Sequence, residues 1–177
     1  MELFSLHVLE AFLKKEGYQS LYIEPTKQDV YPKLALFVGQ DKFERERTIE
    51  IVMKDQIVDF TPQSKEVIYA PYCTLQFQFT FPFKANDITL VDTNRLVSFM
   101  NRNFEMPGLE FDEVSGTIYY RYVMLLNKAN VDLPSIAGVI GIIMLCLEMF
   151  GDALEQVATG KMTTNQLLEM AVLAVRS

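Results

Sequence analysis

The sequence predicts an α+β fold in which helices pack on one face of an antiparallel sheet of about five strands. Three patterns support this prediction: a long apolar segment typical of a buried helix, a run of alternating apolar and polar residues, and two short strand patterns that flank a loop of hairpin length. The chain has 177 residues, of which 50% are hydrophobic, and this is enough for one hydrophobic core. We therefore expect a single domain over residues 1–177.

The apolar segment 135–150 predicts a central helix. It follows Asp132 and Pro134, which are typical of a helix N-terminus. Because apolar residues surround this helix, we expect a sheet to cover one side and another helix, or a second copy of the chain, to cover the other. A glycine within a helix costs about 1 kcal/mol relative to alanine, so Gly138 and Gly141 predict the close approach of another backbone.

The same helix predicts a homodimer. Its apolar side chains point in several directions, and they include Val139, Ile140, Ile142, Ile143, Leu145 and Met149. A sheet covers only one side of a helix, and each apolar side chain left in water forgoes roughly 1.5 to 3 kcal/mol. We therefore predict self-association through the helix around Ile140, with Val139, Ile140 and Ile143 as the interface candidates.

A membrane span is the alternative interpretation of this helix. A bilayer span needs about 20 apolar residues, whereas Glu148 ends this run after about a dozen. Asp152 and Glu155 follow within the same predicted helix. The sequence therefore favours a buried helix of a soluble protein, with no membrane partner.

Helix and strand periodicities extend over most of the remaining chain. The helix patterns lie at 3–16, from Asn86 or Asp87 to about 103, and at 163–175, which opens with the capping-box pair Thr163 and Gln166. The strand patterns lie at 20–24, 33–38, 47–54 and 74–83, with a hairpin at 109–112 and 117–126 and a short strand at 67–70. The second helix is expected to turn an apolar side inward that consists of Leu96, Val97, Phe99, Met100 and Phe104.

Charge and composition exclude several classes of function. The formal net charge is −7 and basic residues are scattered among more numerous acids, so we expect no nucleic-acid partner. The first helix lacks a leading cationic segment and carries Glu2 and Glu10, unlike a secretory signal, so we expect a cytoplasmic protein. Cys73 and Cys146 lie in apolar or β-patterned runs, and we interpret them as small buried residues rather than as a disulfide or reactive thiol.

Patterns for catalysis or metal binding are not evident. His7 is the single histidine, and its place on the first helix favours a packed or solvated side chain over a general base. One histidine and two separated cysteines do not predict a zinc site. The sequence also has no G-x-S-x-G, P-loop or G-x-G-x-x-G spacing. We therefore predict no enzyme activity, no cofactor and no metal.

The predicted hairpin holds the densest acidic cluster, Glu110, Asp112 and Glu113. Strand alternation places Glu110 and Asp112 on one face, where we expect them to meet water; a cation site or an acid–base pair is the alternative. Arg121 lies between two tyrosines on the second strand. We interpret it as a cross-strand partner of Glu110 or Asp112, with ligand recognition as the alternative.

A family resemblance rests on residues 94–126. This segment has a helix with asparagines and hydrophobic residues, then Gly108, a short strand that ends in Asp112, a turn, and a strand with the pair Tyr120-Arg121. The pattern resembles the central part of the YbjN-like family, which is also described as a family of bacterial sensory transduction regulators. It consists mostly of hydrophobic periodicity.

The predicted order of elements also resembles type III secretion chaperones, whose fold the YbjN-like family is thought to share: helix, three strands, helix, two strands, helix. The chain departs from the family pattern in Met106-Pro107, in its unusually apolar long helix and in the added segment 57–71. The resemblance implies a bacterial, cytoplasmic, dimeric and non-enzymatic protein of chaperone-like or regulatory type. It transfers no catalytic residues.

Two functional classes remain. A polypeptide-binding module would use the exposed face of a sheet or a free strand edge. A small-molecule binder or enzyme would need a pocket with convergent polar groups, for which the neighbourhood of Glu110, Tyr119 and Arg121 offers candidates. We predict the polypeptide-binding class and keep a pocket near the hairpin 109–126 as the alternative.

Overall fold

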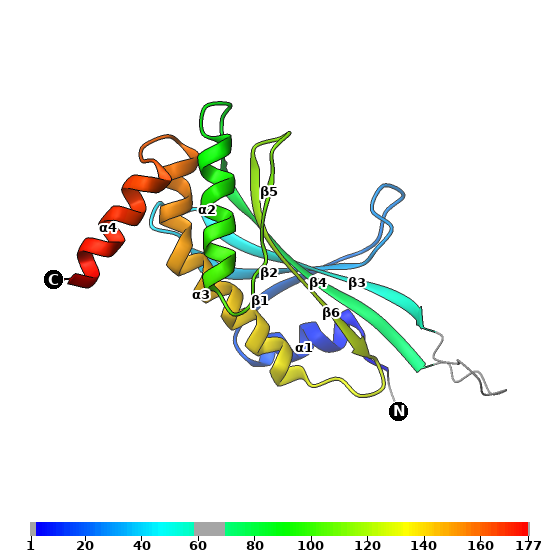
Figure 1. The fold of residues 1–177 in the computed structure, drawn as a ribbon. Helices are drawn as coiled ribbons and strands as arrows, with labels where there is room; N and C mark the ends of the chain where they lie inside the picture. Colours follow the sequence, from blue (N-terminus) through cyan, green and yellow to red (C-terminus); the bar gives the residue numbers. More distant parts are fainter. Residues whose placement is uncertain (1–2, 59–69, 177) are drawn as a thin grey trace, which may run out of the picture. The chain divides into compact units, whose positions relative to one another are not determined.

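The computed structural model describes residues 3–58 and 70–176 (Figure 1). Over this part of the chain the architecture is α+β, an open antiparallel sheet of six strands with four helices, some of them packed against the sheet. In chain order the elements are α1 (Leu6–Lys15), β1 (Gln19–Ile23), β2 (Lys33–Gln40), β3 (Glu46–Val58), β4 (Ala70–Lys84), α2 (Leu90–Asn103), β5 (Leu109–Asp112), β6 (Thr117–Asn127), α3 (Leu133–Ala158) and α4 (Thr164–Arg176). The strand order in the sheet is β1-β2-β3-β4-β6-β5.

The sheet has one strand more than the predicted number of about five. Four strands precede α2, at the places of the strand patterns 20–24, 33–38, 47–54 and 74–83. The last two form a long antiparallel pair, from Glu50 opposite Gln78 to Val58 opposite Ala70. This order differs by one strand and one helix from the order given above for secretion chaperones, which has three strands before its second helix and one helix after its last strand. The short strand predicted at 67–70 lies outside the described residues except for Ala70, where β4 begins.

Internal contacts divide the chain into two compact units, 1–78 with 122–138 and 79–121 with 139–177. The elements β4, β6 and α3 contribute residues to both units.

In the first unit, α1 forms where the sequence predicts a helix. Ser5 caps its N-terminus, because the Ser5 hydroxyl accepts a hydrogen bond from the Val8 amide (3.4 Å). The helix buries the predicted apolar face, Leu6, Leu9 and Leu13. It ends before Gly17, whose φ of 90° lies in the left-handed region that favours glycine. α1 packs against β1 and β2.

The sheet of the first unit buries one face and exposes the other. Leu34 of β2 pairs with Ile51 of β3, which pairs in turn with Phe77 of β4, and all three side chains are fully buried. Their neighbours along the strands point the opposite way, because side chains alternate along a strand. The alternation predicted for 74–83 is therefore confirmed in both units: Leu75, Phe77, Phe79, Phe81 and Phe83 are all buried.

In the second unit, α2 begins later than predicted. Its N-cap is Thr89, so the predicted start at Asn86 or Asp87 is wrong. Asn86 holds a turn instead, because its side-chain oxygen accepts hydrogen bonds from the amides of Ile88 (3.0 Å) and Thr89 (3.2 Å). The predicted inward side is confirmed for Leu96, Val97 and Met100, whereas Phe99 lies beside this face and is 42% exposed.

α3 is a single helix of 26 residues at the predicted place. Within the second unit its end is tied to the start of α2, because the Thr89 hydroxyl donates a hydrogen bond to the Ala158 carbonyl (2.8 Å). α4 opens with the predicted capping box: the Gln166 side-chain oxygen accepts from the Thr163 amide (2.9 Å), and the Thr163 hydroxyl accepts from the Gln166 amide (3.3 Å). α4 contacts α2 in the same unit.

Candidate functional site

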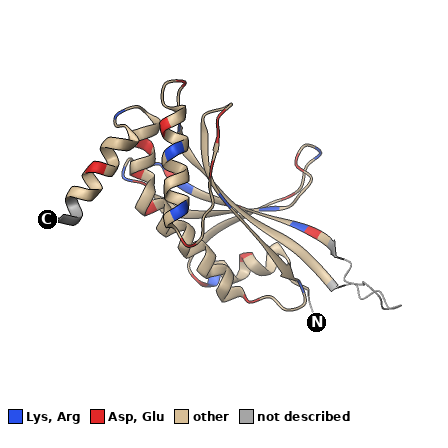
Figure 2. Ribbon diagram, viewed as in Figure 1, with Lys and Arg blue, Asp and Glu red and all other residues tan. Residues whose placement is uncertain are grey.

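The hairpin of β5 and β6 contains the predicted ion pair. Glu110 lies directly opposite Tyr119, and Arg121 is the next residue of β6 on the same face. Arg121 Nη2 lies 2.6 Å from Glu110 Oε1, with the two side chains 42% and 33% exposed. Figure 2 shows the acidic residues on this hairpin. The cross-strand partner of Arg121 is therefore Glu110, one of the two acids that the sequence offered.

The electrostatics of this pair keep each group in its ordinary protonation state. Burial acts to raise the pKa of Glu110, but hydrogen bonds from Arg121 and Tyr119 outweigh it and hold this pKa below its usual value. The hydrogen bond to Glu110 raises the pKa of Tyr119, and the same carboxylate raises the pKa of Arg121. An ionised carboxylate, a neutral phenol and a charged guanidinium do not form an acid–base pair poised near neutral pH.

Asp112 has a different role at the end of the same strand. Its carboxylate accepts hydrogen bonds from the Val114 amide (3.0 Å) and the Ser115 hydroxyl (2.6 Å), so it holds the hairpin turn. The hydrogen bond from Ser115 is the main cause of its lowered pKa. Gly116 completes the turn with a φ of 69°, where a Cβ would lie 2.2 Å from the Ala85 carbonyl oxygen. Asp112 is therefore a turn residue.

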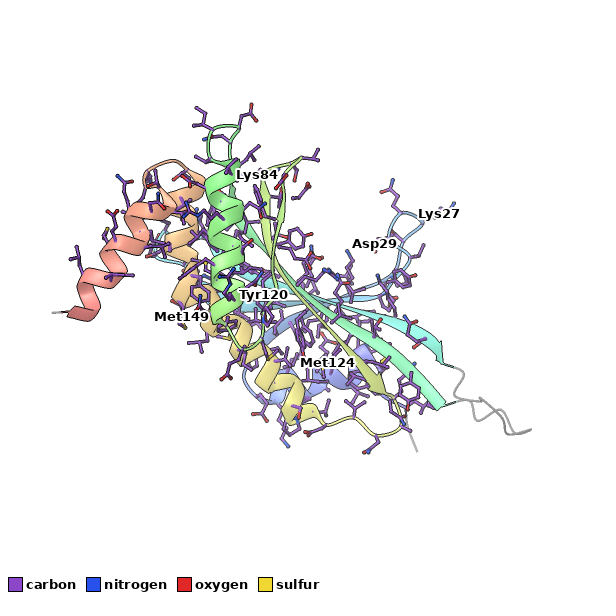
Figure 3. The ribbon with its side chains drawn as sticks, viewed as in Figure 1. Lys27, Asp29, Lys84, Tyr120, Met124 and Met149 are labelled. Carbon is purple, nitrogen blue, oxygen red and sulfur yellow. The ribbon has the colours of Figure 1, made fainter. Side chains whose placement is uncertain are left out.

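Within residues 94–126, side chains hold the connection between α2 and β5 in a way that the sequence did not predict. The Asn101 side chain donates to the Leu109 carbonyl (2.7 Å) and accepts from the amides of Gly108 (3.2 Å) and Leu109 (3.0 Å). The hydroxyl of the buried Tyr120 donates to the Met106 carbonyl (2.9 Å), and Figure 3 labels this residue on β6. A Cβ on Gly108 would lie 2.8 Å from the Arg121 carbonyl oxygen. These residues of the motif therefore have structural roles in joining α2 to β5.

The remaining candidates for chemistry are one histidine and two cysteines. His7 is exposed and its ring lies 4.1 Å, centre to centre, from the ring of Tyr22. Cys73 and Cys146 are free and buried, as predicted, and burial raises the pKa of Cys146 to about 12. Within the described ranges, no group of three or more His, Cys, Asp or Glu side chains is placed to hold a metal ion.

The structure places the predicted interface residues of α3 inside the chain. Ile140 and Ile143 are fully buried and Val139 is nearly so, whereas Leu145 and Met149 are 52% and 56% exposed. Met149 is labelled on α3 in Figure 3. The surface that α3 offers to another molecule is therefore the side of Leu145 and Met149, not the side of Ile140.

The expectation for the two helix glycines is wrong for the isolated chain. We predicted that Gly138 and Gly141 admit another backbone, but a Cβ built on either glycine meets no atom within 4 Å. Both glycines lie on the exposed side of α3. Among the described residues, no neighbour explains why the helix tolerates them.

α3 is also long and apolar enough to cross a membrane. Its most apolar stretch of 18 residues has a mean hydropathy of 2.1, and 33% of that stretch is buried. Length and composition do not by themselves distinguish a membrane helix from the core helix of a soluble protein. In the part of the chain that the structure describes, Leu145 and Met149 are the large apolar side chains of α3 that are exposed.

Other apolar side chains of the second unit are also exposed. They lie on α2 and α4 and include Val91, Phe99, Met170, Val172 and Leu173. α4 borders an open apolar hollow of about 470 Å³, lined by Leu168, Glu169, Val172 and Leu173. Large exposed apolar surfaces mark places where a protein meets another molecule.

In the first unit, the edge strand β1 borders a second candidate surface. β1 has β2 as its sole neighbour in the described sheet, and the two strands pair without a bulge. On the exposed face, Leu21 is 65% exposed. A shallow groove of about 300 Å³ lies on this face, with a lining that includes Gln19, Leu21, Ala35, Phe37, Glu46 and Thr48.

The two edges of the sheet differ in their protection. Native proteins guard an edge strand with charged side chains, proline or a bulge, because its unpaired backbone groups can pair with another chain. β5 carries Glu110 and Asp112, whereas β1, with the sequence QSLYI, has no charged residue and no proline. The sequence already shows that this strand lacks charge and proline, but only the strand order identifies β1 as an edge.

Comparisons with protein-family models and with curated proteins each found no match to this chain.

Proposed function

We propose that the protein is a non-enzymatic, chaperone-like or regulatory protein of the bacterial cytoplasm, and that it binds a polypeptide partner and acts as a homodimer. The observation that carries the proposal is the unprotected edge of β1 with its exposed apolar residues. The resemblance of residues 94–126 to the YbjN-like family, and through it to secretion chaperones, points to the same class.

The binding mode that we propose is the addition of an extended segment to β1. Strand addition draws affinity from backbone hydrogen bonds along a free edge and specificity from side-chain contacts on the sheet faces. β1 offers an uncharged edge, with Leu21 and Ile23 exposed on one face. The groove beside Leu21 provides a place for a side chain of the bound segment.

The alternative, a small-molecule or catalytic site at the hairpin, has less support. The polar groups that would have to serve a ligand already satisfy one another, since Glu110 accepts from both Arg121 and Tyr119. A ligand would have to displace this ion pair before it could use Arg121.

Selection from a phage-displayed library of short random peptides tests the proposal. A selected peptide should bind with amide shift changes at residues 19–23 in NMR spectra. Leu21→Lys should weaken its binding at least roughly tenfold, because a lysine on an edge strand opposes pairing. Glu50→Lys is the matched control, since Glu50 is also an exposed strand residue but pairs on both sides, with Ala35 of β2 and Gln78 of β4. Equal weakening by both variants, or shifts confined to the hairpin 109–126, would contradict the proposal.

A further inference from the structure

The groove beside β1 has apolar residues along part of its lining. Leu21 of β1 lies directly opposite Ala35 of β2, and Phe37 is the next residue of β2 on the same face. Beside these two larger side chains, the small side chain of Ala35 leaves the surface hollow, and the groove measures about 300 Å³. Its lining residues all belong to the first unit. A segment added to β1 would lie along the border of this groove.

The lining of the groove also contains an acid. Glu46 is the first residue of β3, and its side chain lines the groove together with that of Thr48. Glu46 is exposed, and among the described residues none forms an ion pair or a side-chain hydrogen bond with its carboxylate. Glu50 lies on the same face of β3, but the Lys33 Nζ is 3.6 Å from its Oε2. Glu46 is therefore the better placed of the two acids to pair with a cation of a bound molecule.

The shape and the charge of the groove together select a kind of side chain. Lysine and arginine carry their charge at the end of a long apolar stem, which covers apolar surface while the charged end stays in contact with water. A segment added to β1 would lie three strand spacings, about 14 Å, from β3. A short side chain does not span this distance, whereas a long basic one can extend over Ala35 towards Glu46.

Other occupants of the groove fit less well. An acidic side chain would meet the like charge of Glu46 and of a chain whose formal net charge is −7. A second copy of this chain that added its own β1 would bring the sequence QSLYI, which contains no lysine or arginine. The same net charge attracts a basic partner during its approach. The charge complementarity therefore favours a basic segment of a different polypeptide.

We propose that the segment bound at β1 carries a lysine or arginine whose stem lies on Leu21, Ala35 and Phe37 and whose cation pairs with Glu46. The proposal rests on the strand addition of the proposed function and names the chemistry of the partner. The partner segment is extended, and this basic residue lies on the same side of it as the exposed face of the sheet, because side chains alternate along a strand.

The composition of selected peptides provides the first test. The random peptide library is selected separately on the wild type, on Glu46→Gln and on Glu50→Gln, which each remove at most one negative charge. Wild-type peptides that shift the amides of residues 19–23 should share a lysine or arginine at one aligned position, several-fold above its frequency in the library. Glu46→Gln should lose this enrichment and Glu50→Gln should keep it.

The outcomes of the selection separate this inference from the proposed function. Peptides that bind at residues 19–23 without a shared basic residue would overturn the inference and leave strand addition standing. Equal enrichment on the wild type and on Glu46→Gln would also overturn it, because the cation would then lie elsewhere. A selection that yields no peptide at residues 19–23 would overturn strand addition and the inference with it.

The affinity of one selected peptide provides the second test. Its basic residue is replaced by a neutral one of similar length, norleucine for lysine or citrulline for arginine, and in another peptide by diaminopropionic acid, which is cationic but short. Each replacement should raise the dissociation constant for the wild type by roughly three- to fivefold, as expected for a partly solvated ion pair. Calorimetric titration measures these constants.

The protein variants complete this measurement. Glu46→Gln should bind the basic and the neutral peptide with similar affinity, whereas Glu50→Gln should discriminate between them as the wild type does. Glu46→Lys should instead prefer a peptide with glutamate at the same position, because the charges of the pair are exchanged. High salt should reduce the preference of the wild type. A wild type that binds the basic and the neutral peptide equally well would overturn the ion pair with Glu46.

Discussion

Both sides of α3 carry large apolar residues, yet one side is core and the other is surface. Ile140 and Ile143 have no exposed area, while Leu145, two positions beyond Ile143, is 52% exposed. The hydrophobic character of a residue therefore does not by itself say what it touches. Burial depends on which side of the helix the rest of the chain covers, and the difference predicts opposite responses to the same substitutions.

The largest expected effect is that of a charge on the buried side. Ile140→Asp should destabilise the protein by about 4 kcal/mol or more, because it buries an unpaired carboxylate and removes a packed side chain. Leu145→Asp should change the free energy of unfolding of the single chain by only about 0.5 kcal/mol. Urea denaturation at low protein concentration measures both. Similar losses for the two variants would show that the sides of α3 do not differ as described.

Thiol reactivity compares the exposed and the buried side of α3 at the adjacent positions 145 and 146. Burial raises the pKa of Cys146 from 9.0 to about 12, so at pH 8 its thiolate fraction falls by about a thousandfold. A cysteine introduced by Leu145→Cys should therefore react with iodoacetamide at least about a thousandfold faster than Cys146. The rate at Cys146 should keep rising above pH 9, where that of the introduced thiol levels off. Equal rates at pH 8 would mean that the buried side opens readily.

The strand β6 shows the same contrast between neighbours. The Tyr120 side chain is fully buried and its hydroxyl donates to the Met106 carbonyl (2.9 Å), whereas Arg121 points to the exposed face. Tyr120→Phe should cost about 1 to 2 kcal/mol, because it leaves that carbonyl without this donor. Urea denaturation measures the loss. Val123→Ala, on the exposed face, is the control and should cost far less; an equal cost would contradict the assignment.

A gain in stability is expected on the exposed side of α3. Gly138→Ala should stabilise the single chain by about 0.5 to 1 kcal/mol, because alanine is the better helix former and its Cβ has open space. Gly108→Ala is the control that should destabilise the chain, since its Cβ would lie 2.8 Å from the Arg121 carbonyl oxygen. Melting temperatures at low concentration should rise for the first variant and fall for the second. A loss at Gly138 would indicate a neighbour that the single chain does not show.

The smallest effect is expected for the exposed ion pair. Arg121→Leu should cost a few tenths to about 1 kcal/mol, because both side chains are partly solvated. The pKa of Glu110 is lowered in the folded state, so its contribution is fully present above its usual pKa of 4.5 and is lost as the pH falls through the lower folded-state value. The difference in melting temperature between wild type and variant should therefore shrink in acid. A constant difference would assign the effect to packing.

Local chemistry determined most of the elements in advance. The helix at 133–158, the capping box of Thr163 and Gln166 and the alternation of β4 each follow from residues close in sequence. The pair of Glu110 with Arg121 was also predictable, because the pleat of a two-stranded hairpin sets which side chains share a face. The start of α2 was missed because Asn86 and Thr89 both suit a cap, and Asn86 holds the preceding turn instead.

The sequence by itself determined that α3 would be an apolar helix with more apolar surface than one sheet can cover. Only the tertiary structure decided that Val139, Ile140 and Ile143 face inward while Leu145 and Met149 face outward. The reason is that a helix with apolar residues on every side has no preferred direction until other elements cover one of them. The same holds for β1, whose sequence is that of any short strand, and whose free edge exists because no other described strand lies beyond it in the sheet.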